Sequence, residues 1–144
     1  MAIVASSYNA EIVERLVAGA QEALDRSGVG ENDRIVVWVP GAWEIPAAVR
    51  RLSQAGGWSG FVALGAIIQG ETTHHEHLGR EVAACLMRFT EETNLPAAFG
   101  VLTCDSEEKA NARAGGAEGN KGSECVLHLL ETIDVLDQIK KVRS

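Results

Sequence analysis

Four short apolar runs, none of which alternates with polar residues, constrain the fold of this chain more than any other feature of its sequence. They occupy residues 2–5, 35–39, 61–68 and 97–102. A strand covered on one face alternates apolar with polar residues, whereas a continuous run is typical of a parallel strand covered on both faces. The segments between the runs carry apolar residues at helical spacing, as in Ile12–Leu24. The sequence therefore predicts an α/β fold: a three-layer α/β/α sandwich around a four-stranded parallel sheet.

The starts of the later helices carry capping patterns. Pro46 fits the first turn of the second helix, where a missing N–H costs little. The motif Thr73-x-x-Glu76 has the spacing of a capping box at the start of the third. Asp105 or Ser106 is expected to cap a charged fourth helix. A glycine-rich break over 115–122 then precedes a last helix, whose final dozen residues we expect to be an exposed, fraying end.

Length and charge restrict the class of protein. With 144 residues, the chain is expected to form a single domain over 1–144. Its net charge of −7 argues against binding to nucleic acid or to anionic lipid, because both require clustered Lys and Arg. No apolar run reaches the roughly 18 residues of a membrane span, and no basic-then-apolar leader opens the chain. Cys85, Cys104 and Cys125 form no CxxC motif and are interpreted as buried, reduced thiols, which favours a cytoplasmic location.

Polar and aromatic side chains follow the ends of the predicted strands. In an open parallel sheet, ligands bind outside the carboxyl ends of the strands. The segments at that end are 6–9, 40–44, 69–74 and 103–105. Tyr8 and Trp43 could stack there on a flat heterocycle, and ordinary packing is the alternative interpretation of both.

The segment Gly70–His74 is the most informative of these. Gly70 allows a close approach of backbone to a ligand, and free N–H groups at the following helix start favour an anion such as phosphate. His74 would lie at the positive end of a helix dipole, which favours the neutral imidazole that a general base needs. The alternative is a capped, solvated helix start with an idle histidine.

The sequence lacks the motifs of several other kinds of activity. His74 and His77 could share a helix face, but HExxH is absent and the distant His128 is the remaining histidine outside 74–77, so no metal site is expected. The 115–122 segment lacks the Walker pattern, and GxGxxG is also absent, which leaves nucleotide hydrolysis and a dinucleotide cofactor without support. No Gly-x-Ser-x-Gly elbow supports an esterase.

Taken together and in order, these segments resemble one family closely, lumazine synthase. The matching segments are Val39–Pro46, Ala63–Gly65, Gly70–His74, Phe99–Thr103, Arg113–Gly115 and Gly119–Gly122. The likeness covers about residues 3–136. It implies a flavodoxin-like fold and an enzyme that condenses 5-amino-6-(D-ribitylamino)uracil with 3,4-dihydroxy-2-butanone 4-phosphate. The products are 6,7-dimethyl-8-ribityllumazine, phosphate and water, and the family needs no metal or organic cofactor.

The resemblance also implies roles for individual residues. It makes His74 the proton shuttle and Arg113 the phosphate-binding arginine, with Glu71 and Thr72 as further phosphate contacts. Tyr8 matches the aromatic residue that stacks on the pyrimidine. The rest of the pyrimidine and ribityl site would be Asn9, Ala42, Trp43, Glu44, Ala66, Ile67 and Ile68, joined by Phe99 and Lys121 from a neighbouring subunit.

Assembly is likewise implied by the resemblance. The family forms homopentamers with active sites between adjacent subunits, and some members pack into 60-subunit shells or associate with riboflavin synthase. Tyr8 and Gln69 depart from the usual residues, and the first sheet strand opens the chain without the extra N-terminal strand of many relatives. A non-catalytic shell or cage subunit and a flavin- or lumazine-binding module therefore stand as alternatives. A flavodoxin-like signalling domain is disfavoured, because Asp105 alone is placed for an acidic phosphorylation pocket.

Overall fold

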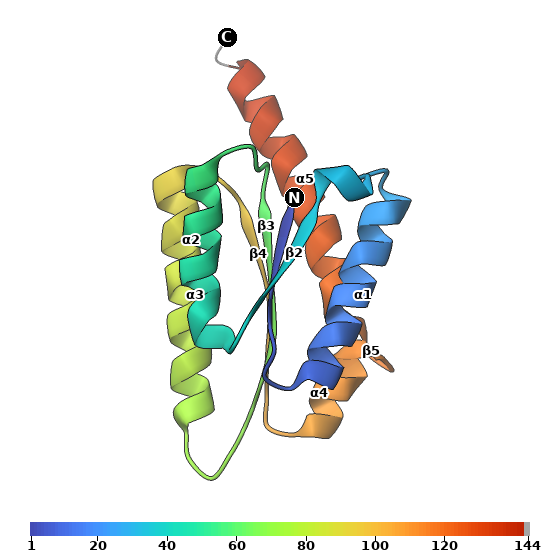
Figure 1. The fold of residues 1–144 in the computed structure, drawn as a ribbon, viewed down its shortest axis with the longest axis vertical. Coiled ribbons are helices and arrows are strands. Elements are labelled where there is room, and N and C mark those ends of the chain that lie inside the picture. Colours follow the sequence, from blue (N-terminus) through green and yellow to red (C-terminus); the bar gives the residue numbers. More distant parts are fainter. Residues whose placement is uncertain (143–144) are drawn as a thin grey trace.

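The structure, a computed structural model that describes residues 1–142, is built on a parallel sheet seen nearly edge-on in Figure 1. The strands lie in the order β2 (Ile35–Val39), β1 (Ala2–Ser6), β3 (Phe61–Ile68) and β4 (Ala97–Cys104). Every neighbouring pair is parallel, and Val4 of β1 lies in register with Val37 on one side and Ala63 on the other. The predicted four-stranded parallel sheet is confirmed.

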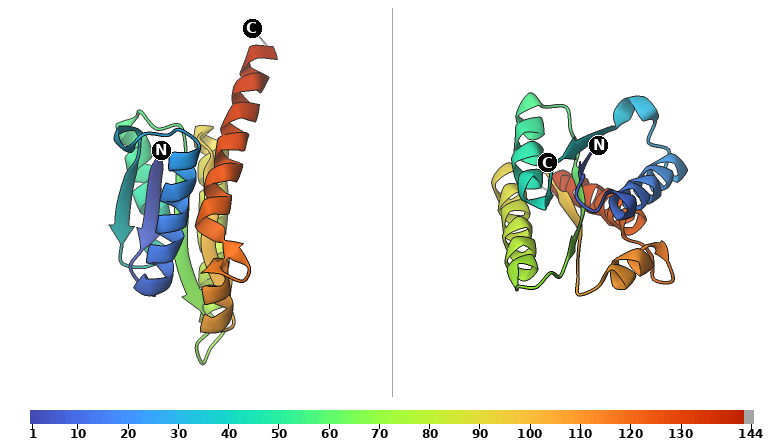
Figure 2. Two further views of the ribbon diagram at one scale, coloured as in Figure 1. Left: turned by 90° about the vertical axis from the view of Figure 1, so that its right-hand side faces the viewer. Right: turned by 60° about the horizontal axis from the view of Figure 1, so that its bottom comes forward.

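Helices cover both faces of this sheet. The helices α2 (Ile45–Ala55) and α3 (His74–Thr93) lie on one side, and α1 (Ala10–Arg26), α4 (Glu107–Arg113) and α5 (Lys121–Val142) lie on the other (Figure 1). Short 3-10 turns precede β2 and α2, at Glu31–Asp33 and Ala42–Glu44. The C-terminal half of α5 runs past the sheet (Figure 2). The three-layer sandwich is therefore confirmed.

The alternating side chains of β1 supply both halves of the core. Ile3 and Ala5 pack with α1 and α5, whereas Ala2 and Val4 pack with α2 and α3. All four are fully buried, because a central parallel strand is covered on both faces. On the α2–α3 side, Phe61 and Phe89 meet edge-to-face with ring centroids 5.5 Å apart.

Glycines allow α1 and α5 to cross closely. A Cβ built on Gly122 would overlap the main-chain carbonyl oxygen of Leu16, and one on Gly19 would overlap the Asn120 side chain. Asn120 uses this proximity: its Nδ2 donates to the Arg15 carbonyl at 2.9 Å, and its Oδ1 accepts from the Ser123 N–H at 3.2 Å. One side chain thus caps α5 and ties it to α1.

Three sequence expectations about the strands and loops need correction. Cover on both faces holds for β1 and β3, but β2 and β4 are edge strands, with Ile35 and Trp38 of β2 and Phe99 of β4 exposed. The glycine-rich break is a small antiparallel hairpin, β5 (Ala114–Gly116) and β6 (Gly119–Asn120), and α5 begins at Lys121. Positive φ at Gly115 and Gly119 is what permits that turn.

The helix starts and the cysteines also differ in part from expectation. The capping box at Thr73 is wrong, because the Thr73 side chain accepts no backbone hydrogen bond from α3. At α4, by contrast, the Ser106 hydroxyl accepts from the Lys109 N–H, which confirms Ser106 as the cap. Cys85 is exposed on α3, so the expectation of three buried thiols holds for Cys104 and Cys125 only.

Candidate active site

The carboxyl ends of β1 and β3, with the loop after β2, surround a cavity of about 380 Å³, here called the His74 cavity. Its lining residues are Ser6, Tyr8, Gly41, Ala42, Trp43, Ala66, Ile67, Ile68, Gly70, Thr72, His74, His75 and Leu78. Most of the residues expected to contact the pyrimidine and ribityl groups are among them. The parallel sheet brings them together because each follows or ends a strand at the same edge.

Two aromatic side chains that line this cavity are exposed to solvent. Tyr8 is 74% exposed and Trp43 is 67% exposed. Water therefore reaches most of both rings, and a ligand or a second polypeptide could cover them at little rearrangement cost. Ordinary core packing, the alternative interpretation of these two residues, does not describe them.

Asn9 and Glu44 do not line this cavity, but each forms a hydrogen bond to a residue that does. Asn9 adopts a left-handed backbone conformation with φ 58°, and its Nδ2 donates to the Ala66 carbonyl at 2.7 Å. The Glu44 carboxylate accepts from the Gly41 N–H at 2.9 Å. Both are among the predicted substrate contacts, but in this chain they hold the loops after β1 and β2. Glu71 likewise lies outside the cavity lining, exposed in the loop after β3.

The loop after β3 places His74 at the first residue of α3. The Thr72 hydroxyl accepts from the His74 N–H at 3.3 Å. A Cβ on Gly70 would meet no atom within 4 Å, so this loop leaves open space beside the cavity. Thr72 and His74 both line the His74 cavity.

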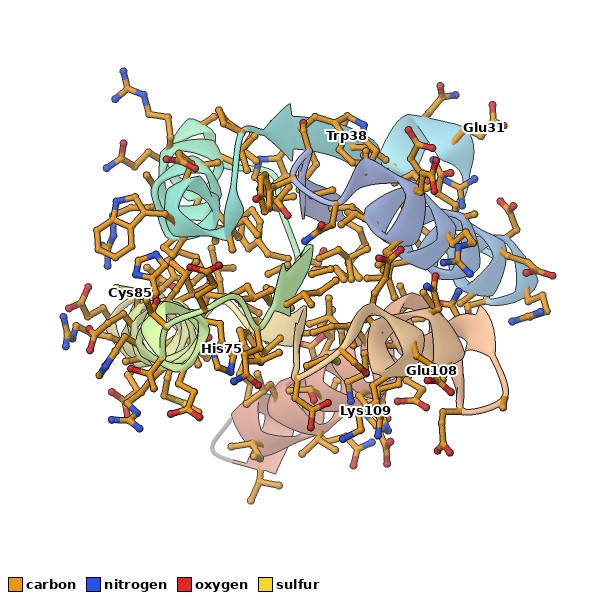
Figure 3. All side chains as sticks on the ribbon, turned by 90° about the horizontal axis from the view of Figure 1, so that it is seen from below. Glu31, Trp38, His75, Cys85, Glu108 and Lys109 are labelled. Carbon is orange, nitrogen blue, oxygen red and sulfur yellow. The ribbon has the colours of Figure 1, made fainter. Side chains whose placement is uncertain are left out.

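His75 is a cavity residue that sequence reasoning missed. Its side chain is only 8% exposed, and its Nδ1 has no hydrogen-bond partner among residues 1–142. In Figure 3, which looks at the carboxyl end of the sheet, His75 and Cys85 both project from α3. The pattern His74-His75-Glu76-His77 gave no way to tell which imidazole turns inward.

A second cavity, about 550 Å³, lies between β4, α4 and the start of α5 and is here called the Arg113 cavity. Its polar and aromatic lining includes Phe99, Asp105, Lys109, Arg113, Glu118, Lys121 and Glu124. Phe99, Arg113 and Lys121, all expected site residues, meet in it. The structure thus separates Arg113 from Thr72 and His74, with which sequence reasoning had grouped it.

Charges in the Arg113 cavity are partly paired. Lys109 Nζ lies 2.6 Å from Asp105 Oδ2, and Lys121 Nζ lies 3.4 Å from Glu124 Oε2. The hydrogen bond from Lys109 lowers the pKa of Asp105, and burial raises the pKa of the Cys104 thiol in the same wall. Arg113 has no carboxylate partner among residues 1–142; its Nη1 donates to the Lys109 carbonyl at 3.2 Å. Most of its guanidinium donors are therefore available to an anion.

Two further features bear on the expectations from sequence. No helix within residues 1–142 is both long and apolar enough to cross a membrane. Over the same residues, no group of three or more His, Cys, Asp or Glu side chains is placed to hold a metal ion.

Fold and cavities define a class: an α/β protein that carries, at the carboxyl end of a parallel sheet, an aromatic-lined cavity and a separate cation-lined one. Comparison with known proteins is more specific. The family model described as 6,7-dimethyl-8-ribityllumazine synthase matches residues 1–137. The chain belongs to this family, which confirms the resemblance carried by its motifs.

Curated relatives agree along nearly the whole chain. The chain is 44% identical over 142 residues to a 6,7-dimethyl-8-ribityllumazine synthase of Leuconostoc mesenteroides, covering 99% of this chain and 91% of the relative. It is 46% identical over 136 residues to the protein of that name from Xanthomonas oryzae, covering 94% and 88%. The Pediococcus pentosaceus protein is 40% identical over 141 residues, covering 98% and 90%.

Proposed function

We propose that this chain catalyses the reaction named by its family. It condenses 5-amino-6-(D-ribitylamino)uracil with 3,4-dihydroxy-2-butanone 4-phosphate and releases 6,7-dimethyl-8-ribityllumazine, phosphate and water. The proposal depends on two observations taken together: the family model matches residues 1–137, and the chain has two cavities suited to the two substrates. One offers aromatic and apolar walls to a flat ring, and the other offers cations to a phosphate.

The His74 cavity would take the pyrimidine. Tyr8 and Trp43 present exposed ring faces for stacking, and Ala66, Ile67 and Ile68 form the apolar floor at the end of β3. His74 at the mouth would move protons as the amine and ketone form a Schiff base and as the ring closes. Holding the two substrates together would supply most of the rate gain, up to about 7–11 kcal/mol in well-oriented systems.

The phosphate group of the second substrate would bind to the guanidinium of Arg113. That side chain has free donors, but it lines a different cavity of the same chain from His74. We therefore infer that each working site joins the His74 cavity of one subunit to the Arg113 cavity of the next. Arg113 would then be supplied in trans along with Phe99 and Lys121, whereas sequence reasoning had assigned only the last two to the neighbour.

A homopentamer is the proposed assembly. A closed ring of head-to-tail contacts, in which one face meets a different face of the next copy, creates such sites at every interface. Exposed apolar residues near both cavities, Trp43 and Phe99 among them, support burial against another chain. A 60-subunit shell and association with riboflavin synthase remain proposals of the same kind, motivated by the family.

The proposed location is the cytoplasm. All three cysteines are free, and Cys104 and Cys125 are buried as thiols. Reduced, unpaired cysteines are typical of proteins in reducing compartments.

The first experiment measures lumazine formation. Purified protein is mixed with both substrates, and fluorescent product is followed above the uncatalysed rate. Acceleration that is lost in Arg113→Ala supports the synthase. No acceleration from folded, assembled protein contradicts it and favours a binding or scaffold role for the same architecture.

A mixing experiment tests the shared site. His74→Ala and Arg113→Ala chains are unfolded together, refolded as a mixture and assayed beside each variant alone. If sites form between subunits, random assembly makes about a quarter of the interfaces intact, and activity returns toward that fraction. If each site belongs to one chain, every site keeps a defect and the mixture stays as slow as its parts.

A further inference from the structure

The Arg113 cavity contains one cation that the roles proposed above leave unused. Lys109 lies one helical turn before Arg113 on α4 and lines the same cavity. The two side chains share a helix face because they are four residues apart. Figure 3 shows Lys109 on α4 at the carboxyl end of the sheet. Lys109 and Arg113 are therefore placed to meet the same anion.

Lys109 is held by a partner that an anion could replace. Its Nζ lies 2.6 Å from Asp105 Oδ2, and the two side chains are 57% and 54% exposed. An ion pair in such exposed surroundings is weak, because water screens it and both side chains lose freedom. A phosphate dianion offers the ammonium group more charge and more acceptor oxygens than one carboxylate does.

Among residues 1–142, no other carboxylate that lines the cavity is paired with Lys109 or Arg113. Glu124 is paired with Lys121 at 3.4 Å. Arg113 forms no ion pair among residues 1–142; its Nη1 donates a hydrogen bond to the Lys109 carbonyl at 3.2 Å. With Asp105 displaced, Lys109 and Arg113 would be two cations on one face of α4, and Glu118, which also lines the cavity, forms no ion pair with either among residues 1–142.

We propose that Lys109 is a second phosphate-binding residue of this cavity, and that Asp105 competes with phosphate for it. The inference rests on the proposed function, because the phosphate ester is a substrate of that reaction. No bond is made or broken at Lys109; its ammonium group exchanges one hydrogen-bonded anion for another. Removing the lysine and removing its competitor must then have opposite effects.

The test titrates inorganic phosphate into the assembled full-length protein and measures its dissociation constant by calorimetry. Lys109→Gln is expected to weaken binding about 3- to 10-fold, as for loss of one partly exposed ionic contact. Asp105→Asn is expected to strengthen binding about 2- to 3-fold, because Lys109 no longer needs to leave a charged partner. Lys141→Gln, a lysine exposed at the far end of α5, is the matched control and should bind as wild type does.

A purely structural role predicts another pattern. If the Lys109–Asp105 pair only braces α4, both variants weaken phosphate binding alike and lower the melting temperature together, and the proposal is overturned. A Lys109→Gln protein that binds phosphate as Lys141→Gln does overturns it as well.

Turnover separates this inference from the proposed function. In an active enzyme, Lys109→Gln should raise the KM for the butanone phosphate by the same factor while kcat and the KM for the pyrimidine hold. If the wild type makes no lumazine, the proposed function fails, and the phosphate titrations still decide whether Lys109 binds the anion.

Discussion

Asn9 joins the turn after β1 to the end of β3, since its Nδ2 donates to the Ala66 carbonyl at 2.7 Å from a left-handed backbone conformation. Asn9→Ala loses both the bond and a residue that tolerates this conformation, so we expect a loss of about 1–3 kcal/mol in the free energy of unfolding. Asn9→Gly loses only the bond and should cost less. Urea denaturation of the three proteins checks the order, and equal losses would show that the backbone conformation contributes nothing.

The crossing of α1 and α5 depends on the absence of a side chain at Gly122. In Gly122→Ala the new Cβ would overlap the Leu16 carbonyl oxygen, which belongs to helix backbone and cannot rotate away. We expect the helices to separate, at a cost near the upper end of the about 1–3 kcal/mol that is typical of overpacked sites, because the clash is with backbone. Gly30→Ala is the matched control, because φ there is −66° and a Cβ would make only an ordinary contact. Thermal unfolding distinguishes the two, and similar melting temperatures would contradict the clash.

His74→Ala should slow turnover without abolishing it. General acid–base catalysis contributes about 10²- to 10⁴-fold, and the juxtaposition of the two substrates would survive the change. Steady-state kcat measures the loss. His77→Ala, at an exposed position three residues further along α3, should turn over as wild type does. Complete loss of activity in a folded, assembled His74→Ala protein would mean that the imidazole does more than move protons.

Stability should fall at alkaline pH because of a buried thiol. Burial raises the pKa of Cys125 to about 11 from 9.0. Between these values the unfolded chain has lost the thiol proton and the native chain keeps it, so the free energy of unfolding decreases as pH rises, by about 2–3 kcal/mol in all. Above pH 11 both states are ionised and this contribution levels off.

Denaturation at pH 8 and pH 10.5 measures that slope. Cys125→Ala should reduce it, even though the variant starts less stable, and the smaller part that remains would include Cys104, whose pKa burial also raises. Cys85→Ala removes an exposed thiol and should leave the slope unchanged. An equal slope in all three proteins would assign the alkaline loss to other groups.

Features that depend on a short stretch of sequence could be predicted, whereas features that depend on the packing of distant segments could not. The strands and the Ser106 cap follow from short patterns, and the structure has them where expected. The edge position of β2 is set by sheet order, which no pattern in Ile35–Val39 encodes.

The candidate site shows the same limit. Motif order indicated Arg113 and His74, but their placement in different cavities depends on how α4 follows β4. The inward position of His75 depends on how α3 is rotated against the sheet. The Lys109–Asp105 pair is local, at i,i+4 spacing, but its place in the Arg113 cavity depends on the packing of α4. Three histidines within four residues, or one lysine in a charged helix, do not show which side chain will face a cavity.

The sheet order has a consequence for how the chain is made. β1 is synthesised before both of its neighbours, β2 and β3, and β3 begins only at Phe61. Until that residue has been synthesised, one hydrogen-bonding edge of a strand that is apolar over residues 2–5 stays uncovered. The nascent first half should therefore depend on chaperone shielding, and ribosome stalling before residue 61 should be the point at which this protein is most prone to aggregate.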